Sequence, residues 1–309
     1  MKRLESVGIL LVLLALCTFC TFTVQGFGTT DNARNLLQAV STVGMIACTM
    51  MLCLGTSDVD LSIGSTAALS GVVATVLVKG GSPAHIGIGA ALGAGALVGL
   101  VNGFVVAKLG VNALIATLAS MQFVRGAAYL VAPGGTSIGV ADETFISVGT
   151  WDLAGIRAPI WYMLAFFVLF GFLLNRTVFG RNALAIGGNM ESARLAGIPV
   201  VRTRIWIFVL QGVMAALAGI VLASRVSSGQ PQAQVGLELQ VISACVLGGV
   251  SLTGGVASLS GVVGGVLIMG VVQNAMSLKS IDAYWQMVVS GVVLLAAVLL
   301  DRLKHRRQA

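Results

Sequence analysis

Long apolar stretches free of charge alternate with short polar segments along almost the whole chain. A helix that crosses a membrane needs about 20 predominantly apolar residues. The pattern therefore predicts an all-α polytopic membrane protein with about ten transmembrane helices in a single domain, residues 1–309. One predicted span is short and rich in glycine, so we expect it to be broken or re-entrant, which requires cover by protein. That span is 239–251, and the others are 6–24, 36–55, 61–79, 87–107, 113–131, 159–176, 205–225, 259–278 and 284–301.

The composition supports this class. Of the 309 residues, 57% are apolar and 9% are charged, whereas an average soluble domain carries about 25% charged residues. So few charges cannot cover the surface of a soluble protein of this size, which argues against a soluble enzyme. The five cysteines all fall within predicted spans, so we expect small buried apolar residues and not disulfides or metal ligands.

Lysine and arginine indicate the orientation, because cytoplasmic loops carry an excess of both. With the N-terminus in the cytoplasm, alternation across the spans places both termini and the basic loop 177–204 on the cytoplasmic side. The longest exterior loop is then 132–158, which is either a landing surface for an outside partner or a plain connector. The formal net charge of +7 lies on the cytoplasmic side and reports membrane orientation, not nucleic-acid binding.

The first span could also be read as a signal peptide, because Lys2 and Arg3 precede an apolar run. Residues 18–28 offer no small-x-small cleavage site, so an uncleaved helix is the better interpretation.

Glycines recur at the spacing of helix contacts. Small-xxx-small pairs let membrane helices approach closely, so we expect these glycines in the core of a tight bundle. The same spacing also suits helices that slide during transport. The pairs are Gly89/Gly93 and Gly95/Gly99/Gly103. In addition, Leu-Ser-Gly-Val-Val occurs at 69–73 and at 259–263, which fits internal duplication and coincidence equally well.

The chain lacks the motifs of common catalytic sites. No H-E-x-x-H motif occurs, and no glycine is followed by lysine, so there is no phosphate-binding loop with which to hydrolyse ATP. Acids buried in mid-span usually mark proton-coupled carriers, but the acids here fall near span ends or in loops. We therefore expect no catalytic residue, no metal site and no cofactor in this chain, and a self-powered secondary transporter is disfavoured.

The basic loop contains a small helix whose two ends are both marked. Asn189 suits the N-cap, Glu191 lies in the first turn where the helix dipole favours an acid, and Gly197 suits the C′ position. The stretch 190–196 covers about two turns. Because this chain has no site with which to hydrolyse ATP, the pattern predicts a docking helix for a separate energy-supplying subunit. An ordinary surface helix fits the pattern equally well.

Polar side chains within the spans form a second candidate site. Uncharged amides suit a path for neutral polyols, and they also suit interhelical hydrogen bonds, which are commoner. Arg125 is a functional candidate within an apolar run, and it could also snorkel. Asp60 can cap the helix expected to begin at Leu61. The candidate path residues are Asn102, Asn112, Gln122, Arg125, Gln273 and Asn274.

The segment Gly180-Arg-Asn-x-x-Ala-Ile-Gly-Gly-Asn-x-x-Ser-Ala-Arg-x-x-Gly-Ile198 resembles the ATPase-docking loop of bacterial ABC monosaccharide importer permeases, the ribose, xylose and arabinose group. Asp60-Leu-Ser-Ile-Gly-Ser65 is similar to the D-L-S-V-G-S segment of this family. Gly99-x-x-Asn102-Gly103, Thr117-Leu118 and Arg125-Gly126 resemble its N-G, T-L and R-G pattern. Asn112 stands where proline is more frequent in the family, and the segments after it, with 223–231 and 294–298, resemble the arabinose subgroup.

The resemblance implies a permease subunit in the bacterial inner membrane that imports a monosaccharide, with L-arabinose the expected sugar. It implies four partners: a second permease copy, a periplasmic sugar-binding protein, the sugar, and a cytoplasmic ABC ATPase with two fused nucleotide-binding halves that binds ATP and Mg. The alternative is an autonomous secondary carrier or channel for small polar solutes. The resemblance assigns docking to Gly180, Arg181, Gly187, Gly188, Asn189, Ala193 and Gly197, and the capped helix adds Glu191.

Overall fold

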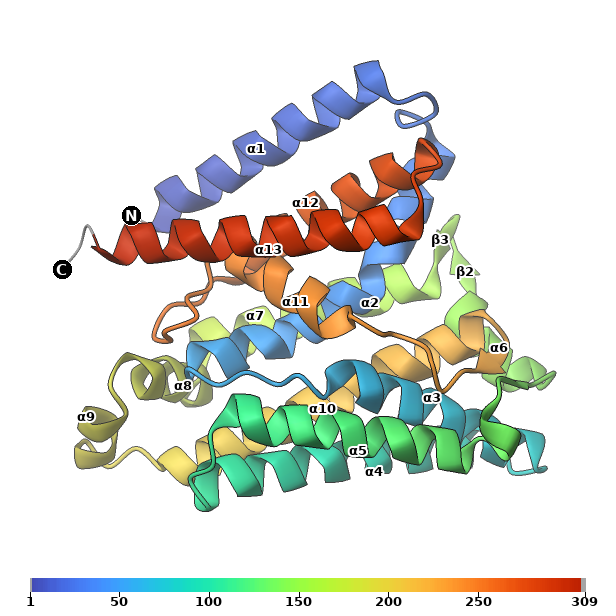
Figure 1. Cartoon of the computed structure of the whole chain (residues 1–309), viewed down its shortest axis with the longest axis horizontal. Helices are drawn as coiled ribbons and strands as arrows, with labels where there is room; N and C mark the ends of the chain where they lie inside the picture. Colours follow the sequence, from blue (N-terminus) through green and yellow to red (C-terminus); the bar gives the residue numbers. More distant parts are fainter. Residues whose placement is uncertain (1, 307–309) are drawn as a thin grey trace.

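The computed structural model describes the backbone of residues 2–306 and the side chains of residues 8–299. The basic side chains predicted near the two ends of the chain, such as Lys2, Arg3 and Arg302, lie outside the described side chains. Within the described range the fold is almost entirely helical (Figure 1). The helices are α1 (Lys2–Thr23), α2 (Thr30–Gly55), α3 (Ile63–Lys79), α4 (Ala84–Gly103), α5 (Ala113–Val131), α6 (Glu143–Thr150), α7 (Ala158–Arg176), α8 (Val178–Gly188), α9 (Met190–Leu195), α10 (Val200–Arg225), α11 (Leu237–Leu247), α12 (Leu259–Leu278) and α13 (Ala283–Arg306).

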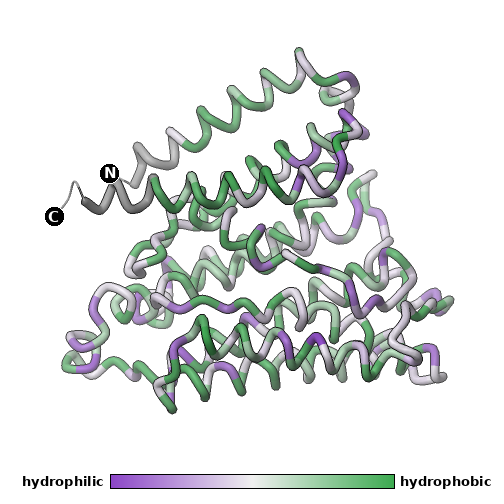
Figure 2. Tube along the Cα trace, in the orientation of Figure 1, coloured by the Kyte–Doolittle hydropathy of each residue, from purple (hydrophilic) through white to green (hydrophobic). Residues whose placement is uncertain are grey.

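Ten of these helices account for the predicted spans. In the described part of the chain, α2, α4, α5, α7, α10 and α12 are long and apolar enough to cross a membrane, and α1, α3, α11 and α13 contain shorter apolar stretches. A π-helical turn, Phe104–Lys108, extends α4. Figure 2 shows the hydrophobic residues along the helices and many of the hydrophilic ones in the turns at both ends of the molecule. The prediction of an all-helical membrane protein is confirmed.

Two of the crossings are interrupted by non-helical backbone. The α2–α3 break consists of residues 56–62, and the α10–α11 break consists of residues 226–236. The 11 residues of α11 cover about 17 Å, which is less than the roughly 30 Å of a hydrocarbon core. The predicted span 239–251 therefore corresponds to a helix that is too short to cross a membrane by itself, followed by a turn. The first break falls where the spans 36–55 and 61–79 leave a connection, and α3 begins at Ile63 instead of Leu61.

The two breaks belong to two sets of helices that run in opposite directions. One set is α2 to α5, and the other is α10 to α13. In Figure 1, α2 runs toward the end of the molecule that carries α8, whereas α10 starts at that end and runs away from it. Within each set, the helix that follows the break contacts the next two helices. Inverted repeats of this kind occur in many transporter folds.

The two sets interlock because each long helix packs against the other set. Helix α10 contacts α3 and α4, and α2 contacts α11 and α12. The repeated Leu-Ser-Gly-Val-Val segments lie in α3 of the first set and at the start of α12 in the second. These positions are not equivalent, so the sequence match does not mark the structural repeat.

The α4–α10 contact depends on glycine. A Cβ atom added at Gly95 would lie 2.5 Å from the carbonyl oxygen of Gly212, and one at Gly103 would lie 2.9 Å from the Cα of Ile205. A Cβ at Gly99 would meet the backbone of Phe208. The bundle-core prediction is confirmed for these three glycines of α4. It is wrong for the pair Gly89/Gly93, where an added Cβ would meet no atom within 4 Å.

Candidate functional site

The basic loop folds into a two-helix elbow, α8 and α9, at the end of the molecule where α1 begins and α13 ends (Figure 1). The Oγ1 of Thr177 accepts a hydrogen bond of 3.3 Å from the backbone N–H of Gly180 at the start of α8. The Oδ1 of Asn189 accepts one of 2.8 Å from the N–H of Ser192 at the start of α9. Both helices therefore begin on side-chain caps. The cap at Asn189 was predicted, and α8 was not.

The C-terminal end of α9 closes as predicted. The N–H of Gly197 donates to the carbonyl of Arg194, and the N–H of Ile198 donates to that of Ala193, both at 3.0 Å. Gly197 has a φ of +78°, a conformation that glycine adopts without strain. This is a Schellman motif, and it fixes the direction in which the chain enters α10.

The elbow presents one face to solvent and buries the other. Ile186, Ala193 and Val200 are buried together, and Gly180 is buried against the end of α7. These residues shape the elbow from within. Leu195 is 82% exposed, and it was not among the predicted docking residues. An apolar residue at the end of a short surface helix could have identified it as a contact residue. The remaining predicted docking residues on the exposed face are Arg181, Gly188, Asn189, Glu191 and Gly197.

The six candidate path residues have separate surroundings. The Nδ2 of Asn102 donates to the Oγ of Ser62 at 2.9 Å, and Asn112 caps α5 by accepting a bond from the N–H of Leu114 at 2.9 Å. The two amides of Asn274 and Asn32 are joined by reciprocal hydrogen bonds of 2.9 Å. These three are interhelical or capping contacts, which was the commoner of the two interpretations.

The other three candidates differ. The Nη1 of Arg125 donates to the carbonyls of Pro231 and Ala233, both at 2.7 Å, and so holds the α10–α11 break. Gln273 is half-buried on α12. Gln122 is exposed at the middle of α5.

A buried ion pair that the sequence did not reveal holds the α2–α3 break. Asp58 and Arg204 form two hydrogen bonds, of 2.6 and 2.8 Å, although 146 residues separate them in the chain. Their side chains are 4% and 13% exposed. The pair ties the beginning of the break to the first turns of α10, next to the elbow.

Two polar side chains, those of Thr117 and Asp60, satisfy backbone groups of the same break. The Oγ1 of Thr117 on α5 accepts from the N–H of Leu61 at 3.1 Å and lies 3.2 Å from the carbonyl of Val59. Asp60 accepts from both the N–H and the hydroxyl of Ser62, at 2.8 and 2.6 Å. The expected capping role of Asp60 is thus replaced by a turn that precedes α3.

The segment 132–158, which was predicted to be exterior, is structured. Helix α6 contacts α10, where the Oγ of Ser224 accepts from the N–H of Gly149 and donates to the carbonyl of Phe145, both at 2.7 Å. The strands β1 (Ile138–Gly139) and β4 (Ser228–Gly229) pair this segment with the α10–α11 break. The strands β2 (Asp152–Leu153) and β3 (Ile156–Arg157) form a small hairpin. The segment is therefore held against α10 and the α10–α11 break.

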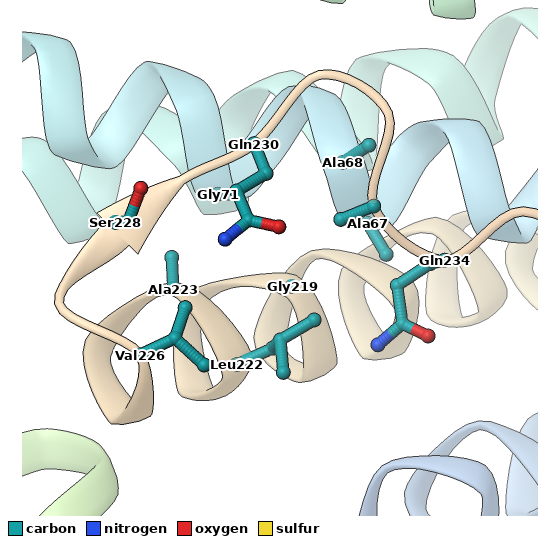
Figure 3. A pocket seen from close by; sticks show the side chains of 11 residues that line it. Ala67, Ala68, Gly71, Gly219, Leu222, Ala223, Val226, Ser228, Gln230 and Gln234 are labelled. Atoms are coloured by element: carbon teal, nitrogen blue, oxygen red, sulfur yellow. The ribbon is translucent and has the colours of Figure 1, made fainter. Parts of the chain in front are cut away.

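A small cavity lies where the α10–α11 break crosses α3 and α10 (Figure 3). Gln230 extends from the break toward Gly71 and Ala223. The cavity measures about 10 Å³, which is about the size of one water molecule. The break therefore fits closely against the helices in this conformation.

Comparisons with known proteins give a consistent result. Residues 32–298 match a family model described as a branched-chain amino acid transport system permease component. The chain is 52% identical over 302 residues to the L-arabinose transport system permease protein AraH of Escherichia coli K12, covering 98% of this chain and 92% of that protein. It is 49% identical to the L-arabinose ABC transporter permease protein AraH of Azospirillum brasilense, over 97% of this chain and 88% of that one.

It is also 39% identical to the ribose import permease protein RbsC of Escherichia coli K12, over 96% of this chain and 93% of that protein. No solved structure matches the chain.

Removing one member of the buried pair should destabilise the protein strongly. Asp58→Asn leaves the Arg204 guanidinium buried without its counter-charge, and breaking such a pair costs about 3–5 kcal/mol. The exposed pair Glu191–Arg194, at 3.3 Å, is the matched control, since an exposed pair contributes about 0–1 kcal/mol. Thermal unfolding in detergent should therefore show a large drop for Asp58→Asn and almost none for Glu191→Gln. A drop of equal size in both variants would contradict this assignment.

Proposed function

The chain belongs to this family of transport-system permease components, and from that premise we propose that it is the transmembrane subunit of an ATP-driven ABC importer that carries L-arabinose from the periplasm to the cytoplasm. The observation that carries the proposal is 52% identity to an L-arabinose permease over 98% of the chain. The resemblance of the docking loop supports the assignment to an ATP-driven importer, whichever sugar is carried.

We propose one permease domain, residues 1–309, that crosses the bacterial inner membrane ten times, as predicted from the apolar pattern. In this orientation the elbow, the beginning of α1 and the end of α13 are cytoplasmic. The position of all three at one end of the molecule supports this arrangement (Figure 1). The exterior segment 132–158, at the other end, would receive a periplasmic sugar-binding protein.

The elbow is the proposed contact with a cytoplasmic ABC ATPase that has two fused nucleotide-binding halves. Its ends are fixed by caps, so docking would not have to order it, which lowers the entropic cost of binding. The exposed Leu195 would enter an apolar pocket of the ATPase, with Arg181 and Glu191 at the polar rim. ATP and Mg would be bound by that partner alone.

The sugar path is proposed to run along the exposed face of α5, between two copies of the permease. In the most apolar 18-residue stretch of α5, only 17% of the residues are buried, whereas 83% are buried in the corresponding stretch of α2. The exposed residues of α4 and α7 that would face lipid are apolar, for example Leu97 and Val168. The amide of Gln122 at the centre of α5 is unsuited to hydrocarbon, so protein or water must meet it.

Transport provides the direct test. In liposomes that contain this chain with its ATPase and binding protein, we expect ATP-dependent uptake of labelled L-arabinose in preference to D-ribose and D-xylose. The chain alone should show no uptake under an ion gradient. Uptake by the chain alone would establish an autonomous carrier instead.

Docking can be tested at Leu195. Replacing this exposed leucine by aspartate places a charge in the proposed apolar contact, and we expect co-purification with the ATPase to fall by at least about tenfold. Leu153, a leucine 58% exposed on the exterior hairpin, is the matched control, and Leu153→Asp should keep the ATPase bound. Equal co-purification of both variants would refute the docking role of α9.

The path face can be tested by crosslinking. Gln122→Cys places a thiol on the proposed face between two copies, so a short bifunctional thiol reagent should join two permease chains in membranes. Val168→Cys, which is 75% exposed on α7, should stay monomeric on denaturing gels, as should the unmodified chain. Crosslinking through position 168 but not 122 would move the interface to α7.

A further inference from the structure

Three segments from distant parts of the chain meet beside the elbow. They are the end of α2 with the first residues of its break, the end of α8, and the turn 251–257 between α11 and α12. The N–H of Gly255 donates to the carbonyl of Gly55 at 3.0 Å. The hydroxyl of Ser57 donates to the carbonyl of Thr253 at 2.7 Å and lies 3.4 Å from that of Gly187. The contact is therefore made largely by backbone atoms.

Glycine makes this approach possible. A Cβ atom added at Gly187 would collide with the carbonyl of Gly55 and would lie 2.6 Å from the backbone nitrogen of Gly255. One added at Gly254 would lie 2.8 Å from the carbonyl oxygen of Gly187. The backbones of the three segments are therefore in close contact at Gly55, Gly187 and Gly254, so a shift of one segment would displace another.

The backbone at the centre of the contact is left-handed at the C′ position of α2, where the N–H of Ser57 donates to the carbonyl of Leu54 and that of Asp58 to the carbonyl of Cys53, a position that usually holds glycine. Ser57 has a φ of +64°, which is uncommon for any residue other than glycine. A residue remains in such a conformation only where its surroundings over-determine it, and sites of this kind cluster in switch regions. The two hydrogen-bond partners of Ser57 and the neighbouring ion pair of Asp58 supply those constraints.

Each of the three segments belongs to a different part of the fold: the first helix set, the second helix set or the elbow. Ser57 begins the α2–α3 break of the first helix set, and Gly255 lies in the turn that follows α11 in the second. Gly187 lies at the end of α8, directly before the docking helix α9. We propose that Ser57, Gly187 and Gly255 are positioning residues of a coupling junction, which passes a displacement of the elbow to both helix sets at once. This inference rests on the proposed function, because it assumes that an ATPase moves the elbow.

The junction would let one elbow act on both helix sets. Asp58, the residue after Ser57, is bonded to Arg204 of α10. The coupling junction is therefore bonded to α2, α8, α10 and the α11–α12 turn. A pull on α8 would act on the long helix of each set, and each long helix packs against the other set.

The test uses the assembled importer with its ATPase and binding protein. Ser57→Ala removes the hydroxyl without adding an atom, and we expect the ATP hydrolysed per sugar imported to rise by about fivefold, the effect of losing one average hydrogen bond from the coupled state. Gly187→Ala should uncouple more severely, because its Cβ would force the segments apart. Gly93→Ala is the matched control, since an added Cβ there meets nothing within 4 Å, and its coupling should equal that of the unmodified importer.

Hydrogen exchange gives a second readout that does not depend on the sugar or on how Gly187→Ala folds. When nucleotide is added to the unmodified complex, exchange should change at residues 55–58 and at 251–257 together. In Ser57→Ala, the response should persist at 55–58 and disappear at 251–257. A response at 251–257 in Ser57→Ala equal to that of the unmodified complex, with unchanged coupling, would overturn the junction. Failure of the unmodified complex to import L-arabinose would instead refute the proposed substrate and leave this exchange result to decide the junction.

Discussion

Backbone that leaves the helical conformation inside a membrane must find partners for its N–H and C=O groups in the protein itself, because lipid offers none. This constraint explains the polar residues at both breaks of this fold. Thr117 reaches from α5 to serve the backbone of Val59 and Leu61 in the first break. Arg125, two turns further along α5, serves the carbonyls of Pro231 and Ala233 in the second. One helix thus supports both breaks.

The same constraint changes the meaning of the polar residues in the spans. Asn102 bonds Ser62, and Asn274 bonds Asn32, so these amides join segments of the protein and are not free to line a path. Gln122 is the exception, since it lies exposed on the helix that supports both breaks. A path beside α5 would therefore run next to the two segments whose backbone is least constrained by regular helix bonding.

Local signals in the sequence were sufficient for much of the fold. The bounds of α5 and α12 agree with the predicted spans residue for residue, because Ser258 and Lys279 flank α12, while Asn112 precedes α5 and Pro133 follows it closely. The ends of α9 were predictable because capping depends on Asn189 and Gly197 alone. The polar residues Thr56, Ser57, Asp58 and Asp60 mark the α2–α3 connection in the sequence, but the ion pair that holds it was not predictable, because its cause is long-range. The Asp58–Arg204 pair joins residues 146 apart. The glycine contacts were also not predictable from spacing, because Gly89/Gly93 and Gly95/Gly99 have the same spacing although only the latter pair contacts another helix.

Because α2 and α10 each pack against the opposite helix set, the order of synthesis also affects how the protein assembles in the membrane. The glycine face of α4 is covered by α10, which the ribosome makes only after α5 to α9. During synthesis the first set must therefore sit in the membrane with this face uncovered, and α3 with it. The chain cannot complete one half before beginning the other, so its helices must insert first and pack afterwards. The contacts of α2 form later still, since its partners α11 and α12 follow α10 in the chain.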